Sequence, residues 1–382
     1  MTDAIYSGVG MSYENYLKRL DEICENLDRL REPISKNKRE PGPYPYYGAS
    51  GIVDHVADYI FDEDLLLVSE DGANLLDRTY PIAFSISGKN WVNNHAHVLR
   101  FLDKVSQRLI EYYLNSIKLD PWVSGMAQPK LNQRNLNSIP VPFPPLPEQK
   151  RIVGILDEAF EAIDQAKANI ERNIENAEEL FQSKLNEIFS QRGEGWEEKR
   201  LEEVCENLDR MREPISKKNR EEGPYPYYGA SGIVDYVADY IFDEDLLLVS
   251  EDGANLLART YPIAFSISGK NWVNNHAHVL RFENMASQRF IEYYLNSIKL
   301  DPWVSGMAQP KLNQRNLHSI PVPFPPLEDQ KKVVSGLDVL KNDVEAITEA
   351  YKNKINGLEE LKKSILQKAF SGELTANEHV AA

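Results

Sequence analysis

The sequence has little cysteine, no long apolar run and no pattern that marks an exported protein. Only two of the 382 residues are cysteines, Cys24 and Cys205, so a disulfide framework is not expected and a reducing compartment is. No apolar run reaches the ~18 residues that cross a bilayer. The N-terminal residues lack the basic and then apolar pattern of a secretory signal. We therefore expect a cytoplasmic chain without a membrane segment.

The sequence also lacks the short motifs of the common enzyme classes. It has no glycine-rich phosphate loop, no GxSxG elbow, no HExxH motif and no Asn/Asp-Pro-Pro-Tyr/Phe motif of amino-methyltransferases. His95 and His97 could form half of a metal site, but no clustered cysteine or carboxylate completes a ligand set. We expect neither a catalytic nor a metal site, and interpret both histidines as packed or hydrogen-bonded.

Acidic residues outnumber basic ones, and the formal net charge is −16. The excess is uneven. Residues 24–146 contain 13 basic and 15 acidic side chains, and residues 205–327 contain 12 and 15, whereas residues 147–195 alone contain 6 and 11. Net charge therefore neither supports nor excludes contact between the two nearly neutral regions and DNA. The acidic stretch fits a basic protein partner and a solvated helix face equally well.

A long internal repeat organises the chain. Shifting the sequence by 181 residues aligns residues 24–146 with residues 205–327 without a gap, and only 12 of the 123 positions differ. We call these two regions the first and second body. Cys24 and Cys205 are repeat equivalents, which favours two buried core positions over a catalytic pair. At this length two or three domains are expected.

Each body is followed by a long segment with a near-heptad apolar pattern, which is typical of a coiled coil. The first segment is residues 148–190, with apolar residues at Ile152, Leu156, Ala159, Ile163, Ala166, Ile170, Ile174, Ala177, Phe181, Leu185 and Ile188. The second is residues 329–371, with Val333, Leu337, Leu340, Val344, Ile347, Tyr351, Ile355 and Leu358 at matching places. Each helix has one apolar stripe, so the simplest burial is against the other helix, in either direction.

Within a body the pattern is mixed. Residues 65–69 read as a buried strand, residues 80–101 as two strands around a Ser-Gly-Lys-Asn turn, and residues 106–119 as a helix with Ser106 as its N-cap. Prolines at 140, 142, 144, 145 and 147 should exclude helix until the long segment begins. The expected fold class is α+β. The expected division is residues 1–147, 148–195, 196–328 and 329–374 for body, helix, body and helix, with a flexible tail at 375–382.

One tract carries a specific resemblance. SGMAQPKLNQRNLNSIPVPFPPLPEQKRIVGILDEAFEAID, followed by a long helix and a second body, resembles the specificity subunit of type I restriction–modification systems. YPYYGASGIV and WVNNHAHVL add to the resemblance, which covers the chain after about residue 16 and includes the order of body and helix.

The resemblance implies two mixed α/β target recognition domains separated by two antiparallel coiled-coil helices. It implies a subunit without catalytic activity that binds double-stranded DNA and two methyltransferase subunits. S-adenosylmethionine would lie on those subunits. Restriction and motor subunits, which use ATP and Mg, would join the complex. No cofactor is expected on this chain.

The near-identity of the two bodies departs from the family pattern of two different recognition domains. It predicts a split DNA site whose halves are inverted repeats, with a spacer of about 5–8 base pairs set by one DNA turn. The alternative is a coiled-coil adaptor whose duplicated bodies bind a protein or a glycan.

Three polar loops in each body offer side chains that could contact DNA. The candidates are Tyr46, Tyr47, Ser50, Lys89, Asn90, Asn93, Asn94, Ser124, Gln128, Lys130, Asn132 and Arg134, with Tyr227, Tyr228, Ser231, Lys270, Asn271, Asn274, Asn275, Ser305, Gln309, Lys311, Asn313 and Arg315 in the second body. Each loop could equally be a turn held by its own polar side chains, and the tyrosines could be core residues. The differing pairs His55/Tyr236, Asp77/Ala258, Leu102/Glu283 and Asn137/His318 should not read bases if both halves are the same.

Overall fold

The computed structural model describes residues 13–375, apart from 126, 192, 194 and 307. Residues 376–382 of the expected flexible tail lie outside the described residues. The chain divides into two compact units, Met1–Ile170 with Asn353–Ala382, and Glu171–Lys352. Each unit contains one body and a segment of both long helices, so the division cuts the helices that the sequence assigned to segments of their own.

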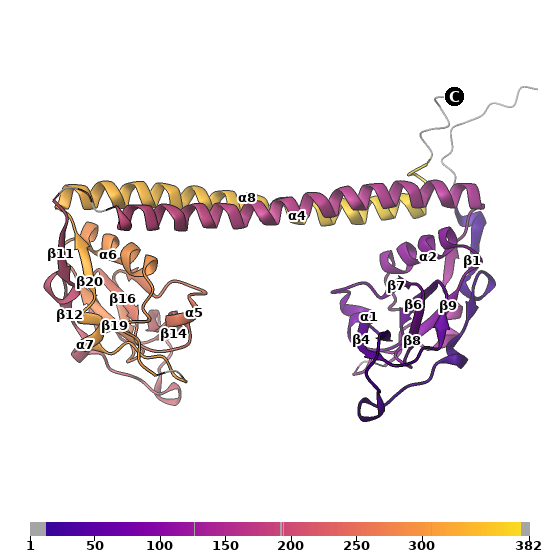
Figure 1. Cartoon of the computed structure of the whole chain (residues 1–382), viewed down its shortest axis with the longest axis horizontal. Coiled ribbons are helices and arrows are strands. Elements are labelled where there is room, and N and C mark those ends of the chain that lie inside the picture. Colours follow the sequence, from indigo (N-terminus) through magenta and orange to yellow (C-terminus); the bar gives the residue numbers. More distant parts are fainter. Residues whose placement is uncertain (1–12, 126, 192, 194, 307, 376–382) are drawn as a thin grey trace, which may run out of the picture. The chain divides into compact units, whose positions relative to one another are not determined.

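The first body contains two four-stranded sheets (Figure 1). The first has the order β2 (Glu25–Asn26), β9 (Ala96–Arg100), β6 (Leu65–Ser69) and β7 (Ala83–Ile86), all antiparallel. The second has the order β4 (Gly51–Val56), β3 (Tyr44–Gly48), β8 (Lys89–Val92) and β5 (Phe61–Asp62), with β3 and β8 parallel. A short ladder pairs β1 (Leu17–Arg19) with β10 (Pro140–Pro142). The helices are α1 (Asn74–Asp77), α2 (Lys104–Ser116) and α3 (Gln133–Asn137), with 3-10 turns η1 (Tyr13–Tyr16), η2 (Leu20–Glu22), η3 (Asp28–Leu30) and η4 (Lys36–Lys38).

The second body repeats this architecture. Its elements are β11 (Glu197–Arg200), η5 (Leu201–Glu203), β12 (Glu206–Asn207), η6 (Asp209–Met211), η7 (Lys217–Asn219), β13 (Tyr225–Gly229), β14 (Gly232–Val237), β15 (Phe242–Asp243), β16 (Leu246–Ser250), α5 (Asn255–Ala258), β17 (Ala264–Ile267), β18 (Lys270–Val273), β19 (Ala277–Arg281), α6 (Met285–Ser297), α7 (Gln314–His318) and β20 (Pro321–Phe324). The sheet orders match those of the first body strand for strand.

Strand β6 is the centre of the first body and is buried along its whole length, as its continuous apolar run predicted. Side chains alternate between the two faces of a strand. Leu66 and Val68 belong to one core cluster, together with Ile110 of α2, which packs over β6 and β7 (Figure 1). Leu65 and Leu67 belong to the cluster on the opposite face. Because core residues pack against both faces of β6, the strand is held firmly in place, and so is the turn that follows it.

Two local predictions for the body were wrong. Residues 80–101 form three strands rather than two, because the chain leaves the first sheet after β7 and enters the second as β8. Helix α2 begins at Lys104, and its N-cap is Asp103, whose carboxylate accepts a hydrogen bond from the Ser106 backbone N–H at 2.9 Å. A carboxylate is a strong N-cap acceptor. The Ser106 hydroxyl lies within hydrogen-bond distance of two acceptors, the same carboxylate at 2.8 Å and the Gln149 side-chain oxygen at 2.9 Å.

The long helices are α4 (Leu146–Ser190) and α8 (Leu327–Ser371). Helix α4 therefore begins before Pro147, contrary to prediction, because a first helical turn does not use the N–H that proline lacks. In the first unit the Lys167 ammonium lies 2.8 Å from Glu359, and Asp164 lies 3.3 Å from the Lys362 ammonium. Between these two ion pairs the residue number falls by three along α4 and rises by three along α8. These α4 and α8 segments are therefore antiparallel.

The corresponding segments of the second unit are antiparallel as well (Figure 1), and Leu185 and Phe189 of α4 share one core cluster with Leu337 and Val334 of α8. The heptad pattern was wrong at Ile347, whose side chain is 45% exposed. Among the described residues, no helix combines the length and apolarity that a bilayer crossing requires.

The C-terminal end of α8 packs against the start of the chain in the first unit. Thr375, which was assigned to the flexible tail, is buried, and its hydroxyl lies 3.2 Å from the Tyr13 hydroxyl. Tyr13 also donates a hydrogen bond to Glu148 at 2.8 Å. The ordered chain therefore continues at least to this residue.

Candidate nucleic-acid interface

Three turns of the first body meet where β6 ends. The chain turns through residues 70–73 directly after Ser69, whose hydroxyl donates to the Ala49 carbonyl at 2.6 Å. This bond attaches the turn between β3 and β4. The Glu70 N–H donates to the His95 carbonyl at 2.9 Å and attaches the turn between β8 and β9. Residues far apart in the sequence are thus held at one end of the body by short hydrogen bonds to backbone carbonyls.

The loop of residues 124–134 joins the same end. Ser124 and Lys130 exchange two backbone hydrogen bonds of 2.8 and 2.9 Å, which close the loop into a tight turn. Gly125 has a φ of +83°, and a Cβ there would lie 2.6 Å from the Gln128 carbonyl oxygen, so only glycine fits. The closed loop carries its polar side chains outward.

The surface that results is called the loop cluster. It consists of Ser50, Asp71, Asn94, His95, Gln128 and Lys130, drawn from four separate segments, and all except the half-buried Asp71 are exposed. Turns and closed loops of this kind place amides, hydroxyls and a cation on a rigid scaffold. Such groups suit hydrogen bonding to base edges and phosphates.

An ion-pair network lies directly beneath the loop cluster. Glu70 accepts a hydrogen bond from Arg31 at 2.7 Å and lies 3.1 Å from the Lys130 ammonium. Asp28 lies 3.4 Å from Arg31 and 2.5 Å from the Nδ1 atom of His97. Asp28 and His97 are almost wholly buried, whereas Lys130 is half exposed. The network therefore runs from the core to the surface and ends on a loop-cluster side chain.

The network lowers the pKa of both carboxyl groups. Burial alone would raise the pKa of Asp28, but its hydrogen bond and charge interaction with His97, together with Arg31, outweigh burial and bring the pKa below its usual value. Burial likewise opposes ionisation of Glu70, and Arg31, His97 and Lys130 together lower its pKa. Both carboxylates are therefore anions over the physiological pH range.

The ligand atoms of Asp28, Glu70 and His97 lie within 4.8 Å of one another, a spacing that could suit a metal ion. Their bonding does not fit one. Both ring nitrogens of His97 are engaged, with Asp28 and with the Leu131 carbonyl at 2.7 Å. Glu70 already faces two cations. The donor set is committed to ion pairs and hydrogen bonds within the protein.

Both histidines are hydrogen-bonded, as interpreted from the sequence, but sequence reasoning did not select Asp71 and His95 as candidate contact residues. The Nδ1 atom of His95 lies 2.8 Å from an Asp71 carboxylate oxygen, which orients the exposed ring. The His95 N–H also donates to the Asn93 side chain at 2.8 Å. The histidine pair was a visible signal, but the turn after β6 that supplies Asp71 lies 24 residues earlier in the chain.

Three predicted contacts are instead buried supports. Tyr46 is 1% exposed, and its hydroxyl accepts from the Ile34 N–H at 2.9 Å. Asn90 is fully buried and donates to the Gly88 carbonyl, and Asn93 caps the turn that carries His95. The pleat of β3 and β8 turns Tyr46 and Asn90 inward, and Asn93 follows directly after β8. The same correction applies to Tyr227, Asn271 and Asn274.

Lys89 lies outside the loop cluster, because residues 89–92 form strand β8 rather than a loop. Lys89 begins this strand and Asn94 follows its end, so at ~3.3 Å per residue the two are roughly 15 Å apart. The Lys89 ammonium lies 4.6 Å from the centre of the Tyr59 ring. Lys89 is exposed.

The remaining candidates divide between support and exposure. Tyr47 is half-buried against Phe84, and Asn132 caps α3 by accepting from the Asn135 N–H at 2.9 Å. Ser50, Asn94, Ser124, Gln128, Lys130 and Arg134 keep exposed side chains.

The second body reproduces the site. Glu251 lies 2.7 Å from Arg212 and 3.1 Å from Lys311, and Asp209 lies 2.6 Å from His278. The equivalent loop cluster is Ser231, Asp252, Asn275, His276, Gln309 and Lys311. None of the 12 positions that differ between the bodies belongs to either loop cluster or to the network beneath it.

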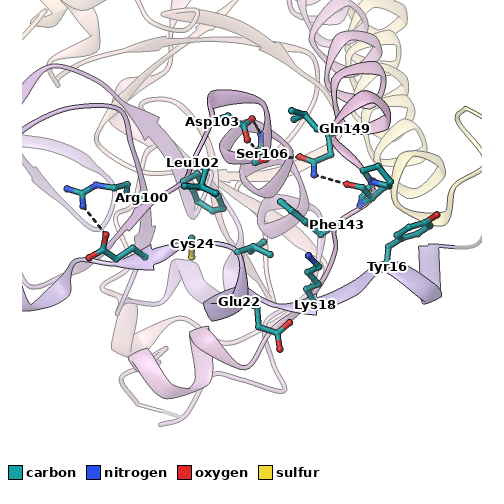
Figure 2. A pocket seen from close by; sticks show the side chains of 16 residues that line it. Tyr16, Lys18, Glu22, Cys24, Arg100, Leu102, Asp103, Ser106, Phe143 and Gln149 are labelled. Carbon is teal, nitrogen blue, oxygen red and sulfur yellow. Dashed lines mark hydrogen bonds and ion pairs between the residues drawn. The ribbon is translucent and has the colours of Figure 1, made fainter.

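A cavity of about 700 Å³ lies at the opposite end of β9, beside the start of α4 (Figure 2). Its lining includes Leu102, which is fully exposed, and Cys24, whose thiol pKa is raised by burial to about 12. Cys24 packs against the core but is only partly buried, whereas a buried position was predicted, and its thiol is unreactive at neutral pH. The repeat equivalent of Leu102 is Glu283, so the cavity is a place where the bodies differ.

Two solved structures share this fold. One similar structure was solved in work on complex assembly and conformational transition of the type I R-M system; the TM-score is 0.72, the identity 19%, and the match covers 94% of this chain and 98% of that one. A second is the HsdS subunit from Thermoanaerobacter tengcongensis, with a TM-score of 0.55, 20% identity and coverage of 94% and 97%. The two bodies and two long helices are thus the architecture of type I specificity subunits.

Sequence comparison assigns the family. The family model described as type I restriction modification DNA specificity domain matches residues 14–176 and 193–357. A putative type I restriction enzyme specificity subunit from Haemophilus influenzae is 28% identical, over 87% of this chain and 89% of that protein, and the EcoDI specificity subunit from Escherichia coli is 22% identical, over 88% and 83%. The chain belongs to the type I restriction–modification DNA specificity family.

Proposed function

We propose that this chain is the sequence-reading subunit of a type I restriction–modification complex, with one recognition domain in each body. The observation that carries the proposal is that the specificity-domain model matches the chain twice, once over each body and the helix that follows it. The loop cluster supplies groups that can read DNA on a rigid scaffold. The chain itself catalyses no reaction, and its role is to select the site at which partner subunits act.

The DNA contacts assigned to each body are those sequence-predicted candidates in the loop cluster and its flanks whose side chains are exposed. In the first body these are Ser50, Asn94, Ser124, Gln128, Lys130 and Arg134, and in the second Ser231, Asn275, Ser305, Gln309, Lys311 and Arg315. Amides and hydroxyls suit base edges, and the cations suit phosphates. Lys89 and Lys270, at the other end of their strands, would contact phosphates outside the base-reading surface.

Both bodies should read the same bases, because the loop clusters and the networks beneath them are identical in sequence. Helix α4 follows the first body, α8 follows the second, and their segments are antiparallel within each unit. This supports two half-sites in inverted orientation. A spacer of about 5–8 base pairs would separate them, from the pitch of DNA.

The partners are double-stranded DNA and the other subunits of the restriction–modification complex. Two methyltransferase subunits, one for each half-site, would carry S-adenosylmethionine. Restriction and motor subunits would supply ATP- and Mg-dependent cleavage. The complex would act in the cytoplasm, where DNA is accessible and Cys24 and Cys205 stay reduced.

Mapping methylation across a genome tests the proposal. The chain would be co-expressed with its cognate methyltransferase subunit in a host that lacks DNA methylation, and modified bases would be located. A split inverted-repeat motif is the expected result. A split asymmetric motif would retain the function but contradict the equivalence of the bodies. A stable complex that methylates no motif would contradict the function itself.

A further inference from the structure

Lys130 and Lys311, the cations of the two loop clusters, are each paired with a glutamate of the network beneath. Lys130 is 52% exposed, yet its ammonium lies 3.1 Å from Glu70, whose side chain is only 12% exposed. In the second body Lys311 and Glu251 have the same distance and the same exposures. The structure thus places a poorly hydrated carboxylate under the lysine that faces the proposed DNA surface.

Glu70 is itself held rigidly from the protein side. Its other carboxylate oxygen accepts from Arg31 at 2.7 Å, and the same Arg31 nitrogen donates to the Ala96 carbonyl at 2.7 Å. The Leu131 N–H donates to the Glu70 carbonyl at 2.8 Å, which fixes the loop to the same residue. One glutamate therefore sets the position of both the Lys130 side chain and the backbone that follows it.

Sequence-independent binding to DNA is driven by cations that neutralise phosphates and release counterions. A lysine with a fixed anionic partner contributes less to that attraction than a free one. Sequence-dependent binding requires the donor to be in one place, which the same ion pair provides. Glu70 therefore weakens attraction to any DNA while keeping the geometry that the correct DNA needs.

We propose that Glu70 and Glu251 are positioning residues for sequence selectivity, which hold Lys130 and Lys311 in place and offset their charge so that they contribute little to nonspecific DNA binding. This rests on the proposed function, since it assigns a role within the same DNA surface. This role differs from that of a purely structural residue in how the loss of the glutamate changes nonspecific DNA binding. Loss of a purely structural residue weakens all binding, whereas loss of the counter-charge strengthens nonspecific binding.

The experiment compares Glu70→Gln with Glu251→Gln, introduced together, against the unsubstituted full chain, each in complex with the cognate methyltransferase subunit. DNA binding is measured between about 50 and 200 mM salt, because affinity that comes from phosphate contacts falls steeply over this range. The probes are a duplex that contains the methylated motif and a scrambled duplex. The matched control is Glu63→Gln with Glu244→Gln, which removes the same charge at Arg100 and Arg281, at the other end of β6 and β16.

Freeing the two lysines should make the slope of log affinity against log salt on scrambled DNA steeper by up to about 1.8, since each phosphate contact contributes about 0.9. Affinity for scrambled DNA at low salt should rise, and the ratio of specific to nonspecific affinity should fall. The control should change the slope much less. Adding Lys130→Gln and Lys311→Gln should reverse the increase, whereas these lysine changes alone should barely alter the nonspecific slope.

Glu70→Asp with Glu251→Asp keeps the charge but shortens the side chain. This variant should keep the nonspecific slope of the parent, and it guards against a glutamine variant that folds poorly. An unchanged or shallower slope in the glutamine variant, or a steep loss of nonspecific slope from the lysine changes alone, overturns the inference. If the unsubstituted complex fails to distinguish the two duplexes, the proposed function fails instead.

Discussion

The two bodies share almost their entire sequence, and the few positions that differ avoid the loop cluster and the network beneath it. Five of the 12 differing positions fall within residues 102–109, at the start of α2, and none falls in the loop cluster. In the first body this end includes the exposed Leu102 beside the cavity at the start of α4 (Figure 2). The loop cluster and the network beneath it, which we call the equal end, are therefore the same in both bodies, whereas the residues around the start of α2, which we call the changed end, differ.

The changed end is where each body contacts the long helices. Leu109 packs with Ile152 and Leu156 of α4 in the first unit. Its equivalent Phe290 packs edge-to-face with Phe189 at 5.3 Å and with Trp196 at 5.6 Å. The helices have diverged much more than the bodies, so the body residue in contact with each helix differs to suit it. The comparison separates a surface that must be equal in both bodies from one that must fit its own neighbour.

The largest expected effect tests the equal end. Asp28→Ala removes the carboxylate nearest to the buried His97 and leaves Arg31 with Glu70 alone, and breaking a buried ion pair on one side costs about 3–5 kcal/mol. Asp209→Ala should cost the same amount in the second body. Urea unfolding of the full chain at pH 7 measures both losses, and clearly unequal losses would contradict the equivalence of the two networks.

The pH dependence supplies an internal check on that result. Because the pKa of Asp28 lies below its unfolded value of about 3.9, its contribution is complete above that pH and is lost as the pH falls through the folded pKa. The stability deficit of Asp28→Ala should therefore shrink below about pH 4. A deficit that stays constant into that range would mean that the carboxylate charge is not its source.

The next effect tests the changed end. Phe290→Leu removes contacts with Phe189 and Trp196 and should cost about 1–3 kcal/mol through the cavity left behind. Leu109→Phe should cost a similar amount for the opposite reason, because a fully buried position in the first unit is overfilled. Thermal unfolding of each variant measures the loss. A neutral result for either exchange would mean that these positions diverged without regard to their helix.

A smaller effect concerns one half of the DNA site at a time. Gln128→Ala removes an exposed amide from the first loop cluster, and loss of a good base contact costs about 1–3 kcal/mol of discrimination. Gln309→Ala is the matched change in the second body. Each should relax the methylated motif in only one half, so the motif becomes asymmetric. Relaxation in both halves from a single change would contradict one body per half-site.

The local pattern of apolar residues predicted much of this fold, and the features that it missed depend on contacts between residues far apart in the sequence. The apolar run at residues 65–69 and the heptads of α4 and α8 depend on near neighbours, and each is present. Tyr46 was misassigned because its inward direction depends on pairing with β4 and β8. The network under the loop cluster was not predicted, since Asp28 and His97 are 69 residues apart and no local pattern connects them.

The smallest effect belongs to a position that differs but lies on neither functional end. His55 is exposed on β4, its equivalent is Tyr236, and exchange of exposed side chains changes stability by less than about 0.5 kcal/mol. His55→Tyr makes the two β4-type strands identical in sequence. Because no loop-cluster residue changes, the methylated motif should stay the same in both halves, as mapped in the host used for the parent chain. A motif change confined to one half would place β4 on the DNA and extend the reading surface beyond the loop cluster.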